Sequence, residues 1–384
     1  MKISLIYTLP FFVLAAVFCF SCSKEENEFP ADISKSVFVY MVADNDLDYY
    51  GVENVIDMQK GLSDTSYGHI IVYLDRASTS NPSHPCLYDI KHDTVQSITS
   101  KIIRVYPEQN SCDAGVFENV FSDAESYCKM FGSDITRLVF WSHGTGWLPQ
   151  NALTPIAKSF GQDSDEEMDI ISLSEVLNKR HFEYILMDAC FMGSLETAFQ
   201  MRKCADYLIL SPSEVLSRGF PYDKIAQYLV EAENCAEEIC KSFYDCYSVK
   251  QNAFCSATIS LEDTKWLDSL AESMNFFYND LCFSDSIAAK IPQYDRTFSG
   301  YFFDFQEFVK LYCKNEKIKD DILKKYNFAV KKYLHTQKMF SVLDLKDTYG
   351  LSIYVPNNFA SRKKVHEYYK KLDWYEKVSD SFNF

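Results

Sequence analysis

Short apolar runs alternate with amphipathic segments along the first half of the chain. The runs that predict buried strands lie at residues 36–43, 70–74, 137–141, 183–187 and 207–210. The segments that predict helices lie at residues 45–61, 115–131, 172–178 and 194–202. Strands that are apolar throughout and alternate with helices are typical of a mostly parallel sheet with helices on both faces. We therefore expect an α/β fold.

Two segments interrupt this alternation. Residues 86–105 carry strand-like fragments separated by turn residues, which predicts a hairpin or an edge of the sheet. Residues 147–169 have no clear periodicity and end in an acidic cluster. A loop of that length in a compact domain is usually functional or disordered. The helix that follows is predicted to begin with a capping box, in which Ser172 is the N-cap and Glu175 lies three residues on.

The C-terminal part of the chain is richer in helix. Amphipathic runs lie at residues 223–249, 263–280, 303–314 and 318–334, and strand-like pieces lie at residues 254–260 and 351–355. We expect residues 36–222 to form an α/β domain and residues 223–384 to form a helix-rich part that completes the fold. The length of 384 residues allows one large α/β domain or two ordinary ones.

The N-terminus has the pattern of an export signal. Lys2 precedes an almost unbroken apolar run that ends in Cys19-Phe20-Ser21-Cys22, which resembles a bacterial lipobox. We therefore expect residues 1–21 to be a lipoprotein signal peptide, Cys22 to carry the lipid, and residues 22–35 to include a flexible acidic tether. The alternative is an uncleaved signal anchor.

The tether also bears on location. Its first residues after Cys22 read SKEENE, and such an acidic stretch resembles the surface-export signals of some Gram-negative lipoproteins. The expected location is the outer membrane of a Gram-negative bacterium, with the membrane as a partner through the lipid. Whether the protein faces the periplasm or the cell surface is left open by the sequence.

Composition and charge exclude several classes of protein. A chain that is 47% hydrophobic and 24% charged is globular rather than disordered, collagen-like or coiled-coil. Its formal charge of −16 repels phosphate backbones, so nucleic acid is not an expected partner. Apart from Cys19 and Cys22 in the lipobox-like segment, the cysteines include no CxxC pair, which disfavours zinc. Without Cys19 and Cys22 eleven remain, an odd number, so at least one thiol is unpaired even if the exported chain forms disulfides.

Two of the predicted strands end in reactive side chains. Residues 137–141 run into Ser142-His143-Gly144-Thr145-Gly146, and residues 183–187 run into Asp188-Ala189-Cys190. The 47 residues from His143 to Cys190 match one βαβ crossover, so adjacent parallel strands would present both at the sheet edge where α/β folds bind ligands. A histidine and a cysteine together supply a base and a nucleophile, because a nearby imidazole favours the attacking thiolate.

The same loops offer further groups for catalysis. The backbone amides of Gly144 and Cys190 are expected to form an oxyanion hole. The helix predicted from Ser194 would favour an anion at Cys190 through its dipole. The alternative is that Cys190 is a packed core residue and that His143 is an ordinary polar one. A serine hydrolase is disfavoured because the chain has no GxSxG motif.

These motifs also resemble those of a known family. His-Gly-x-Gly at residues 143–146 and Asp-Ala-Cys-x-x-Gly at residues 188–193 together resemble the clostripain-like cysteine peptidases, which are relatives of caspases, gingipains and legumains. Segments that support the resemblance lie at residues 37–50, 211–222, 256–263 and 350–356. The resemblance covers residues 36–384 and implies a caspase-like fold, with the catalytic domain in residues 36–222.

The resemblance also implies roles for individual residues. It implies an endopeptidase that cleaves after Arg or Lys, with Cys190 as nucleophile, His143 as general acid and base, and no required third catalytic group. The family's pocket acid, two residues before the cysteine, corresponds to Asp188, and a carboxylate there suits a guanidinium. The alternative role for Asp188 is a cap on the following helix. Glu214 is a second candidate pocket acid, which Arg218 would be able to neutralise.

Some members of this family activate themselves by cutting the loop between the histidine and the cysteine. Lys158 is the one Lys or Arg between His143 and Lys179, and it lies in the long loop described above. We therefore expect self-cleavage between Lys158 and Ser159. The alternative is that Lys158 is an ordinary solvated lysine.

No cofactor is expected to be required, and no metal is assigned to the site. Calcium is considered because some relatives depend on it. Residues 44–48 begin like an EF-hand loop but lack its glycine and its final glutamate. The acids of the long loop would bind a hard cation weakly or would form a solvated acidic surface; they are Asp163, Asp165, Glu166, Glu167 and Asp169.

Two other functions stay open. The first keeps the caspase-like fold without catalysis, as a surface lipoprotein that binds protein or glycan. The second is a structural lipoprotein of a surface assembly. In the leading interpretation the partners are protein or peptide substrates and the membrane, and the chain is expected to act as a monomer.

Overall fold

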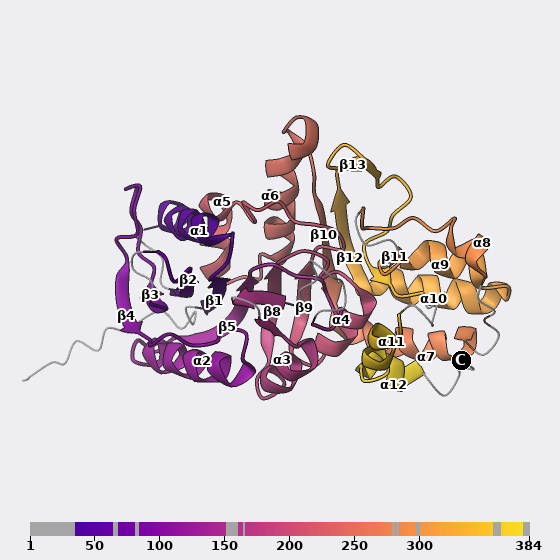
Figure 1. Cartoon of the computed structure of the whole chain (residues 1–384), viewed down its shortest axis with the longest axis horizontal. Coiled ribbons are helices and arrows are strands. Elements are labelled where there is room, and N and C mark those ends of the chain that lie inside the picture. The colour runs from indigo at the N-terminus through magenta and orange to yellow at the C-terminus, as the bar shows by residue number, and fades with distance from the viewer. Residues whose placement is uncertain are drawn as a thin grey trace, which may run out of the picture. The chain divides into compact units, whose positions relative to one another are not determined.

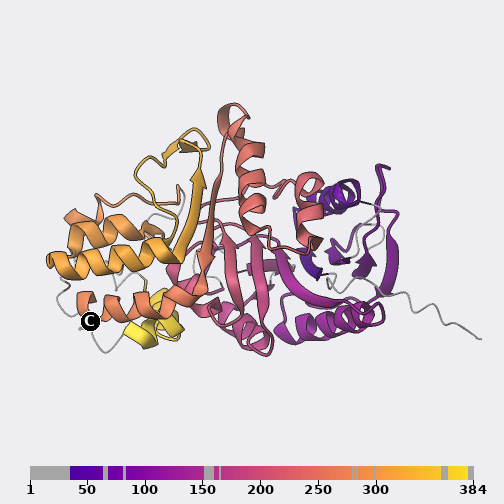
Figure 2. The same cartoon turned by 180° about the vertical axis from the view of Figure 1, so that it is seen from behind.

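The computed structural model describes residues 35–63, 68–80, 84–150, 160–163, 166–278, 281, 284–296, 300–355 and 362–378. These residues belong to one compact unit that begins at Ser34. The strands of this described part include a nine-stranded sheet at its centre (Figures 1 and 2). The predicted signal peptide and Cys22 lie outside the described residues, as does most of the predicted tether.

Among the described residues the main sheet has the strand order β12-β10-β9-β8-β5-β1-β2-β3-β4. Its parallel strands are β1 (Lys35–Ala43), β2 (Ile70–Arg76), β5 (Asp134–Trp141), β8 (Phe182–Asp188) and β9 (Ala205–Leu210). Its antiparallel strands are β3 (Cys86–Asp89), β4 (Lys101–Val105), β10 (Thr258–Asp263) and β12 (Val330–His335). The expected mostly parallel sheet is confirmed, and residues 86–105 form the expected hairpin at its edge.

Helices cover both faces of this sheet, each over its own hydrophobic core. One core lies under α1 (Asp48–Gly61), α5 (Tyr222–Val230) and α6 (Ala236–Ser248). The other lies under α2 (Ala114–Lys129), α3 (Ile170–Leu177) and α4 (Leu195–Met201), which follow one another along the opposite face (Figure 1). Alternate residues of β1 enter the two cores, Val37 and Val39 the first, Phe38 and Tyr40 the second. Burial of both faces is the reason that the strand is apolar throughout.

The C-terminal part packs beyond β10 and β12 (Figure 2). Its further helices are α7 (Leu267–Tyr278), α8 (Asp285–Ala288), α9 (Phe305–Tyr312), α10 (Glu316–Ala329), α11 (Lys363–Tyr369) and α12 (Asp373–Val378). Short strands are β11 (Phe303–Asp304), β13 (Lys338–Met339), β14 (Leu343–Asp344) and β15 (Ser352–Ile353), and single 3₁₀ turns are η1 (Asn252–Phe254) and η2 (Thr264–Trp266). Because β10 and β12 pair into the main sheet and α5 and α6 cover one of its faces, this part shares the sheet and both of its cores with the rest of the chain.

Three local expectations were wrong. The predicted loop at residues 147–169 contains a hairpin of β6 (Phe160–Asp163) and β7 (Glu166–Met168), whose polar residues give no periodic signal. Helix α3 is capped by Asp169 rather than Ser172, because the Asp169 carboxylate accepts a hydrogen bond from the Ser172 amide at 2.8 Å. The predicted helix at residues 318–334 ends at Ala329, because pairing with β10 draws the following residues into β12.

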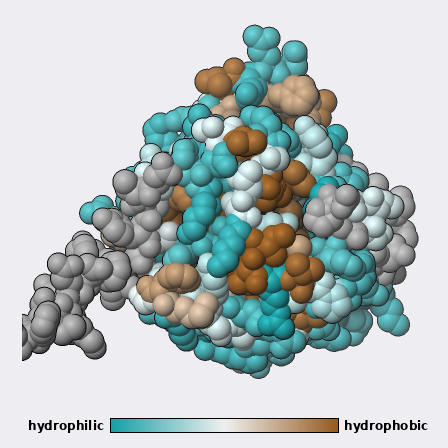
Figure 3. Space-filling view, turned by 90° about the vertical axis from the view of Figure 1, so that its left-hand side faces the viewer, coloured by the Kyte–Doolittle hydropathy of each residue, from teal (hydrophilic) through white to brown (hydrophobic). Residues whose placement is uncertain are grey.

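Strand β4 forms one edge of the sheet and is open to solvent along most of its length. Figure 3 views this side of the molecule and shows apolar side chains exposed among hydrophilic ones. On β4 itself, Ile102 and Val105 are 47% and 54% exposed. None of the helices in the described ranges has the length and apolar character needed to cross a membrane.

Candidate active site

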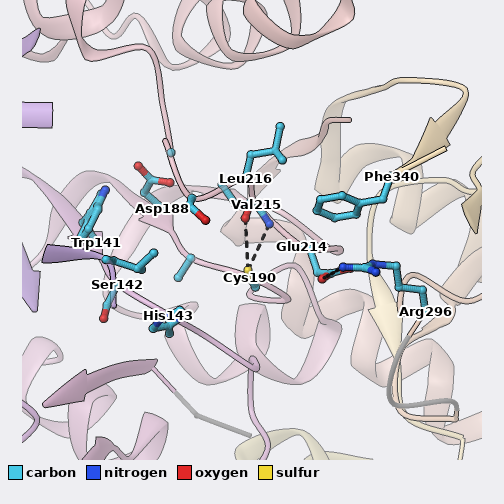
Figure 4. Close-up of a pocket in the computed structure, with 14 residues that line it drawn as sticks. Trp141, Ser142, His143, Asp188, Cys190, Glu214, Val215, Leu216, Arg296 and Phe340 are labelled. Atoms are coloured by element: carbon cyan, nitrogen blue, oxygen red, sulfur yellow. Dashed lines mark hydrogen bonds and ion pairs between the residues drawn. The ribbon is translucent and has the colours of Figure 1, made fainter. Parts of the chain in front are cut away.

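The two reactive residues lie at the carboxyl edge of the sheet. Strands β5 and β8 are adjacent and parallel, with Trp141 opposite Asp188 in register. His143 follows the end of β5 by two residues, and Cys190 follows the end of β8 by two residues. Both line a cavity of about 320 Å³ that Asp188 and Glu214 also line (Figure 4). The structure therefore brings together the predicted dyad and both predicted pocket acids.

The turn that carries Cys190 is held in a defined shape. Phe191 has a φ of 59°, in the left-handed region that costs a non-glycine residue energy. Two contacts keep it there: its amide donates to the Ser213 carbonyl at 2.9 Å, and its ring stacks on Phe302 with centroids 4.8 Å apart. These two contacts thus hold the backbone next to Cys190 in place.

The thiol itself contacts the backbone of Val215. Cys190 Sγ accepts a hydrogen bond from the Val215 amide at 3.2 Å and donates one to the Val215 carbonyl at 3.6 Å (Figure 4). Burial raises the pKa of this thiol to about 12; the Val215 amide opposes the shift, and the carboxylates of Glu214 and Asp188 add to it. The resting thiol is therefore protonated at neutral pH, and attack on a carbonyl requires a base.

The imidazole of His143 is held from the side of β1. Its Nε2 lies 2.6 Å from Asp46 Oδ1. The backbone carbonyl of His143 accepts a hydrogen bond from the Gly161 amide at 2.9 Å. The hydroxyl of the preceding residue, Ser142, donates to the Val42 carbonyl at 2.7 Å. The sequence pattern did not indicate Asp46 as a residue of the site. The available signal was its place after β1, which is the neighbour of β5 in the sheet.

The two predicted oxyanion donors lie on adjoining loops. A Cβ atom at Gly144 would come within 2.7 Å of the Cys190 carbonyl oxygen and 3.0 Å of the Ala189 Cβ. A glycine is therefore needed for the loops after β5 and β8 to approach this closely. The role of the Gly144 and Cys190 amides as oxyanion donors stays a prediction.

Asp188 is a buried carboxyl in the wall of the cavity. It is 3% exposed, and its Oδ2 accepts hydrogen bonds from the Phe220 amide and the Tyr222 hydroxyl, both at 3.0 Å. Burial raises its pKa to about 7, although both hydrogen bonds oppose the shift. Gly219 lies directly against it: a Cβ there would be 2.4 Å from the same oxygen, and the φ of Gly219 is +68°. Glycine at this position is what leaves room for the carboxyl.

Two expectations about the helix after Cys190 were wrong. Helix α4 begins at Leu195, five residues beyond Cys190, and the effect of a helix dipole is confined to the first turn. Its N-cap is Ser194, whose hydroxyl accepts a hydrogen bond from the Thr197 amide at 3.1 Å. Asp188 is therefore not the cap of this helix, and the dipole does not account for the chemistry of the thiol.

Glu214 has a partner that the sequence did not suggest. The Arg296 guanidinium contacts its carboxylate with two nitrogens, at 2.7 and 2.9 Å. The same guanidinium lies over the Phe340 ring at 4.2 Å from the centroid, so the three side chains form one cluster at the cavity wall (Figure 4). Arg218, the expected neutralising residue, instead pairs with Asp57 at 2.8 Å. The neutralising partner of Glu214 is thus Arg296.

Other predicted features lie partly outside the described residues. Lys158 and Ser159 are among the residues not described, and so is Asp165.

In the part of the chain that the structure describes, no group of three or more His, Cys, Asp or Glu side chains is arranged to hold a metal ion. Asp163 accepts a hydrogen bond from the Ser111 amide at 2.6 Å. The cysteines within the described ranges are all free thiols.

Comparison with known proteins agrees with this geometry. The family model described as the clostripain family matches residues 39–381. This chain belongs to the clostripain family. The match includes the whole described sheet except the first residues of β1, and with it the segments that carry His143 and Cys190.

The chain is also similar to individual named proteins and to solved structures. Clostripain of Hathewaya histolytica is 26% identical over 219 residues, which are 50% of this chain but only 41% of that protein. A solved inactive zymogen of a C11 protease from Parabacteroides distasonis is 28% identical with a TM-score of 0.76, over 90% of this chain and 97% of that one.

A secreted C11 cysteine protease from Bacteroides thetaiotaomicron, solved with an irreversible peptide inhibitor, is equally similar. It is 28% identical with a TM-score of 0.76, over 90% of this chain and 99% of that one. The clostripain family and these structural neighbours are cysteine proteases, so this chain is a member of a cysteine peptidase family with the caspase-like α/β fold.

Proposed function

We propose that this protein is an endopeptidase that hydrolyses peptide bonds after Arg or Lys, with Cys190 as nucleophile and His143 as general acid and base. One observation carries the proposal. Both side chains follow the ends of adjacent parallel strands and line one cavity, and Asp188 is buried in the wall of that cavity. The proposed nucleophile, base and cation-binding acid therefore lie at the edge where α/β folds bind ligands.

Acylation follows from these groups. His143 takes the proton of the Cys190 thiol as sulfur attacks the carbonyl carbon of the peptide bond. The carbonyl oxygen becomes an oxyanion, for which the amides of Gly144 and Cys190 are the proposed donors. The carbon–nitrogen bond then breaks, the leaving amine takes the proton from His143, and the acyl group stays on sulfur as a thioester.

Deacylation reverses the proton transfers. Water attacks the thioester carbon while His143 takes one of its protons, and the carbon–sulfur bond breaks to release a carboxylic acid. The proton returns from His143 to Cys190 Sγ. The balance needs only peptide and water, so the proposed reaction requires no cofactor.

A basic residue at the cleavage site fits the charges of the cavity. Glu214 is already paired with Arg296, whereas Asp188 accepts hydrogen bonds from one amide and one hydroxyl. A guanidinium or ammonium beside Asp188 would stabilise its ionised form. It would also offset a carboxylate that raises the pKa of Cys190, so a basic substrate would make the thiol easier to deprotonate.

The pH dependence of selectivity tests the role of Asp188. Because the pKa of Asp188 is raised to about 7, its carboxyl is mostly neutral at pH 6 and mostly ionised at pH 8. We expect the ratio of kcat/KM for a peptide with Arg at P1 to that for the same peptide with neutral citrulline to rise about five- to tenfold over this range. The ratio cancels the titration of the dyad. A constant ratio would exclude Asp188 as the group that recognises the charge.

Self-cleavage between Lys158 and Ser159 is the proposed activation step. On incubation of the purified chain we expect two fragments, one ending at Lys158 and one beginning at Ser159, and a parallel rise in activity. Mass spectrometry measures the fragments and a fluorogenic peptide measures the activity. Lys158→Ala should stay intact with low activity, Lys158→Arg should still be cut, and Lys179→Ala is the control. An intact wild-type chain that is fully active would contradict this step.

The first test of the function uses residues 23–384 and two fluorogenic peptides, one with Arg and one with Leu at P1. We expect the peptide with Arg to be cleaved and the peptide with Leu to stay intact. No cleavage of either peptide, even after the loop at Lys158 has been cut with another protease, would favour the alternative, a catalytically silent surface lipoprotein that binds protein or glycan.

We also propose that the protein is exported and anchored by a lipid on Cys22. The lipobox-like residues before Cys22 support the anchor, and the neighbour from Bacteroides thetaiotaomicron is described as secreted. Radioactive palmitate incorporation that is lost in Cys22→Ala would be the direct evidence.

A further inference from the structure

One carboxylate at the active site has no part in the reaction proposed above. Asp46 Oδ1 lies 2.6 Å from Nε2 of His143, although the two residues are 97 positions apart in the chain. The Asp46 side chain is 81% exposed and that of His143 is 26% exposed. An ion pair this exposed contributes little to the stability of a fold. The effect of this pair therefore falls on the imidazole rather than on the stability of the fold.

The loop that carries Asp46 is anchored on one side by Asn45. The Asn45 side-chain amide donates hydrogen bonds to the carbonyl of Val42 at 3.1 Å and to that of Gln162 at 2.7 Å. Its side-chain oxygen accepts one from the Leu47 amide at 2.8 Å. The residue before Asp46 thus uses both ends of its side chain to hold the loop at the end of β1.

The other side of the loop is anchored as well. Asp48 accepts two hydrogen bonds from the Arg76 guanidinium, at 2.9 and 2.8 Å. The same β6 segment that holds Asn45 also binds the histidine loop, because the Gln162 amide donates to the Ser142 hydroxyl at 3.2 Å. The loops that carry the Asp46 carboxylate and the His143 imidazole are therefore held by one network of hydrogen bonds. A carboxylate held in this way can orient the ring.

The contact has a chemical consequence for the ring. A neutral imidazole has one N–H donor and one acceptor nitrogen, and the hydrogen bond at one nitrogen decides which is which. A proton on Nε2 that is donated to Asp46 leaves Nδ1 as the nitrogen that accepts a proton.

We propose that Asp46 is a positioning residue for His143, which fixes the tautomer and the orientation of the imidazole that deprotonates Cys190. The proposal rests on the proposed function, in which His143 is the acid and base. It adds a group that supports the dyad without touching the substrate.

The test compares three substitutions in the full chain. Asp46→Ala removes the acceptor and is expected to lower kcat for the Arg peptide roughly 10- to 100-fold, the range for loss of one hydrogen bond to a charged group, with KM changed less than about twofold. Asp46→Asn keeps an acceptor oxygen and should recover most of the loss, and Asp46→Glu should recover part of it. A rise in KM with kcat unchanged would overturn the proposal, because it would mean contact with substrate.

A second readout does not depend on peptide cleavage. The rate at which iodoacetamide alkylates Cys190 at pH 7, followed by mass spectrometry, reports how well the imidazole takes the thiol proton. We expect this rate to fall in Asp46→Ala by a similar factor. If wild type cleaves no peptide but Asp46→Ala is alkylated more slowly than wild type, the proposed function is contradicted and the positioning role is supported. If Asp46→Ala matches wild type in alkylation rate, the positioning role is overturned whatever the peptide assay gives.

The chain offers a matched control pair. His181 Nε2 lies 2.9 Å from Asp206 Oδ1, and both of these side chains are more than half exposed. His181 directly precedes β8 and so lies at the opposite end of that strand from Cys190. Asp206→Asn should leave kcat, KM and the alkylation rate unchanged, and the same effect in this variant as in Asp46→Ala would assign the loss to surface charge rather than to position.

Discussion

Replacing Cys190 by alanine is expected to abolish peptide cleavage while the fold is retained. In the proposed mechanism attack requires sulfur in the cavity beside His143, and Cys190 is the one cysteine among the described residues that line it. Loss of the nucleophile in a dyad or triad lowers kcat by at least about 10⁴-fold. The measurement is cleavage of the Arg peptide by wild type and variant at equal concentration, with detection over four decades.

Two controls make this result interpretable. The side chain lost is small, so we expect the midpoint of thermal unfolding to stay within a few degrees of wild type. Cys246→Ala, on α6 outside the cavity, should keep full activity. His143→Ala should be as inactive as Cys190→Ala, because the thiol is protonated at neutral pH and needs the base. Substantial turnover in Cys190→Ala would contradict the role of Cys190 as nucleophile.

Asp188→Asn is expected to remove most of the preference for a basic residue. The asparagine oxygen can still accept the hydrogen bonds from the Phe220 amide and the Tyr222 hydroxyl, so the change removes charge and little else. Loss of one partner of a buried charge pair costs about 2–4 kcal/mol, which is roughly 30- to 1,000-fold in kcat/KM. The measurement is kcat/KM for the Arg and citrulline peptides at pH 8, where only the Arg value should fall.

The stability of the same variant gives an independent check. A carboxyl whose pKa is raised by burial binds its proton more tightly when folded than when unfolded, so the free energy of unfolding falls as pH rises towards and past 7. Asp188→Asn removes this dependence. Wild type should therefore lose thermal stability relative to the variant between pH 6 and pH 9, and equal slopes would contradict the raised pKa.

Glu214 provides the control for selectivity. Its charge is balanced by Arg296, so the double variant Glu214→Gln with Arg296→Gln removes the pair without leaving a free charge in the cavity. We expect this variant to keep the preference for Arg over citrulline within about threefold, as for the loss of a partly exposed pair. Preference lost here and kept in Asp188→Asn would assign the recognition of charge to Glu214.

Much of the catalytic edge could be predicted because its signals are local. A strand buried on both faces is a run of apolar residues, so β5 and β8 can be recognised in the sequence. The residues that follow the carboxyl end of each strand can then be identified from their positions. The crossover length between His143 and Cys190 then indicated adjacent parallel strands, and the register of Trp141 with Asp188 agrees. The extent of the helix predicted at residues 318–334 was wrong because it depends on a distant partner: β12 pairs with β10 more than 60 residues earlier.

The sequence by itself determined the α/β fold, the membership of a cysteine peptidase family and the residues that carry the proposed chemistry. The tertiary structure alone decided which charges meet: Arg296 with Glu214, 82 positions apart, and Asp46 with His143, 97 positions apart. It also decided the protonation of Cys190 and Asp188, because burial and neighbouring charge set a pKa and neither is a property of the residue itself. Periodicity along a chain records which side chains are buried, whereas ion pairs and proton affinities depend on distances that only the folded chain brings about.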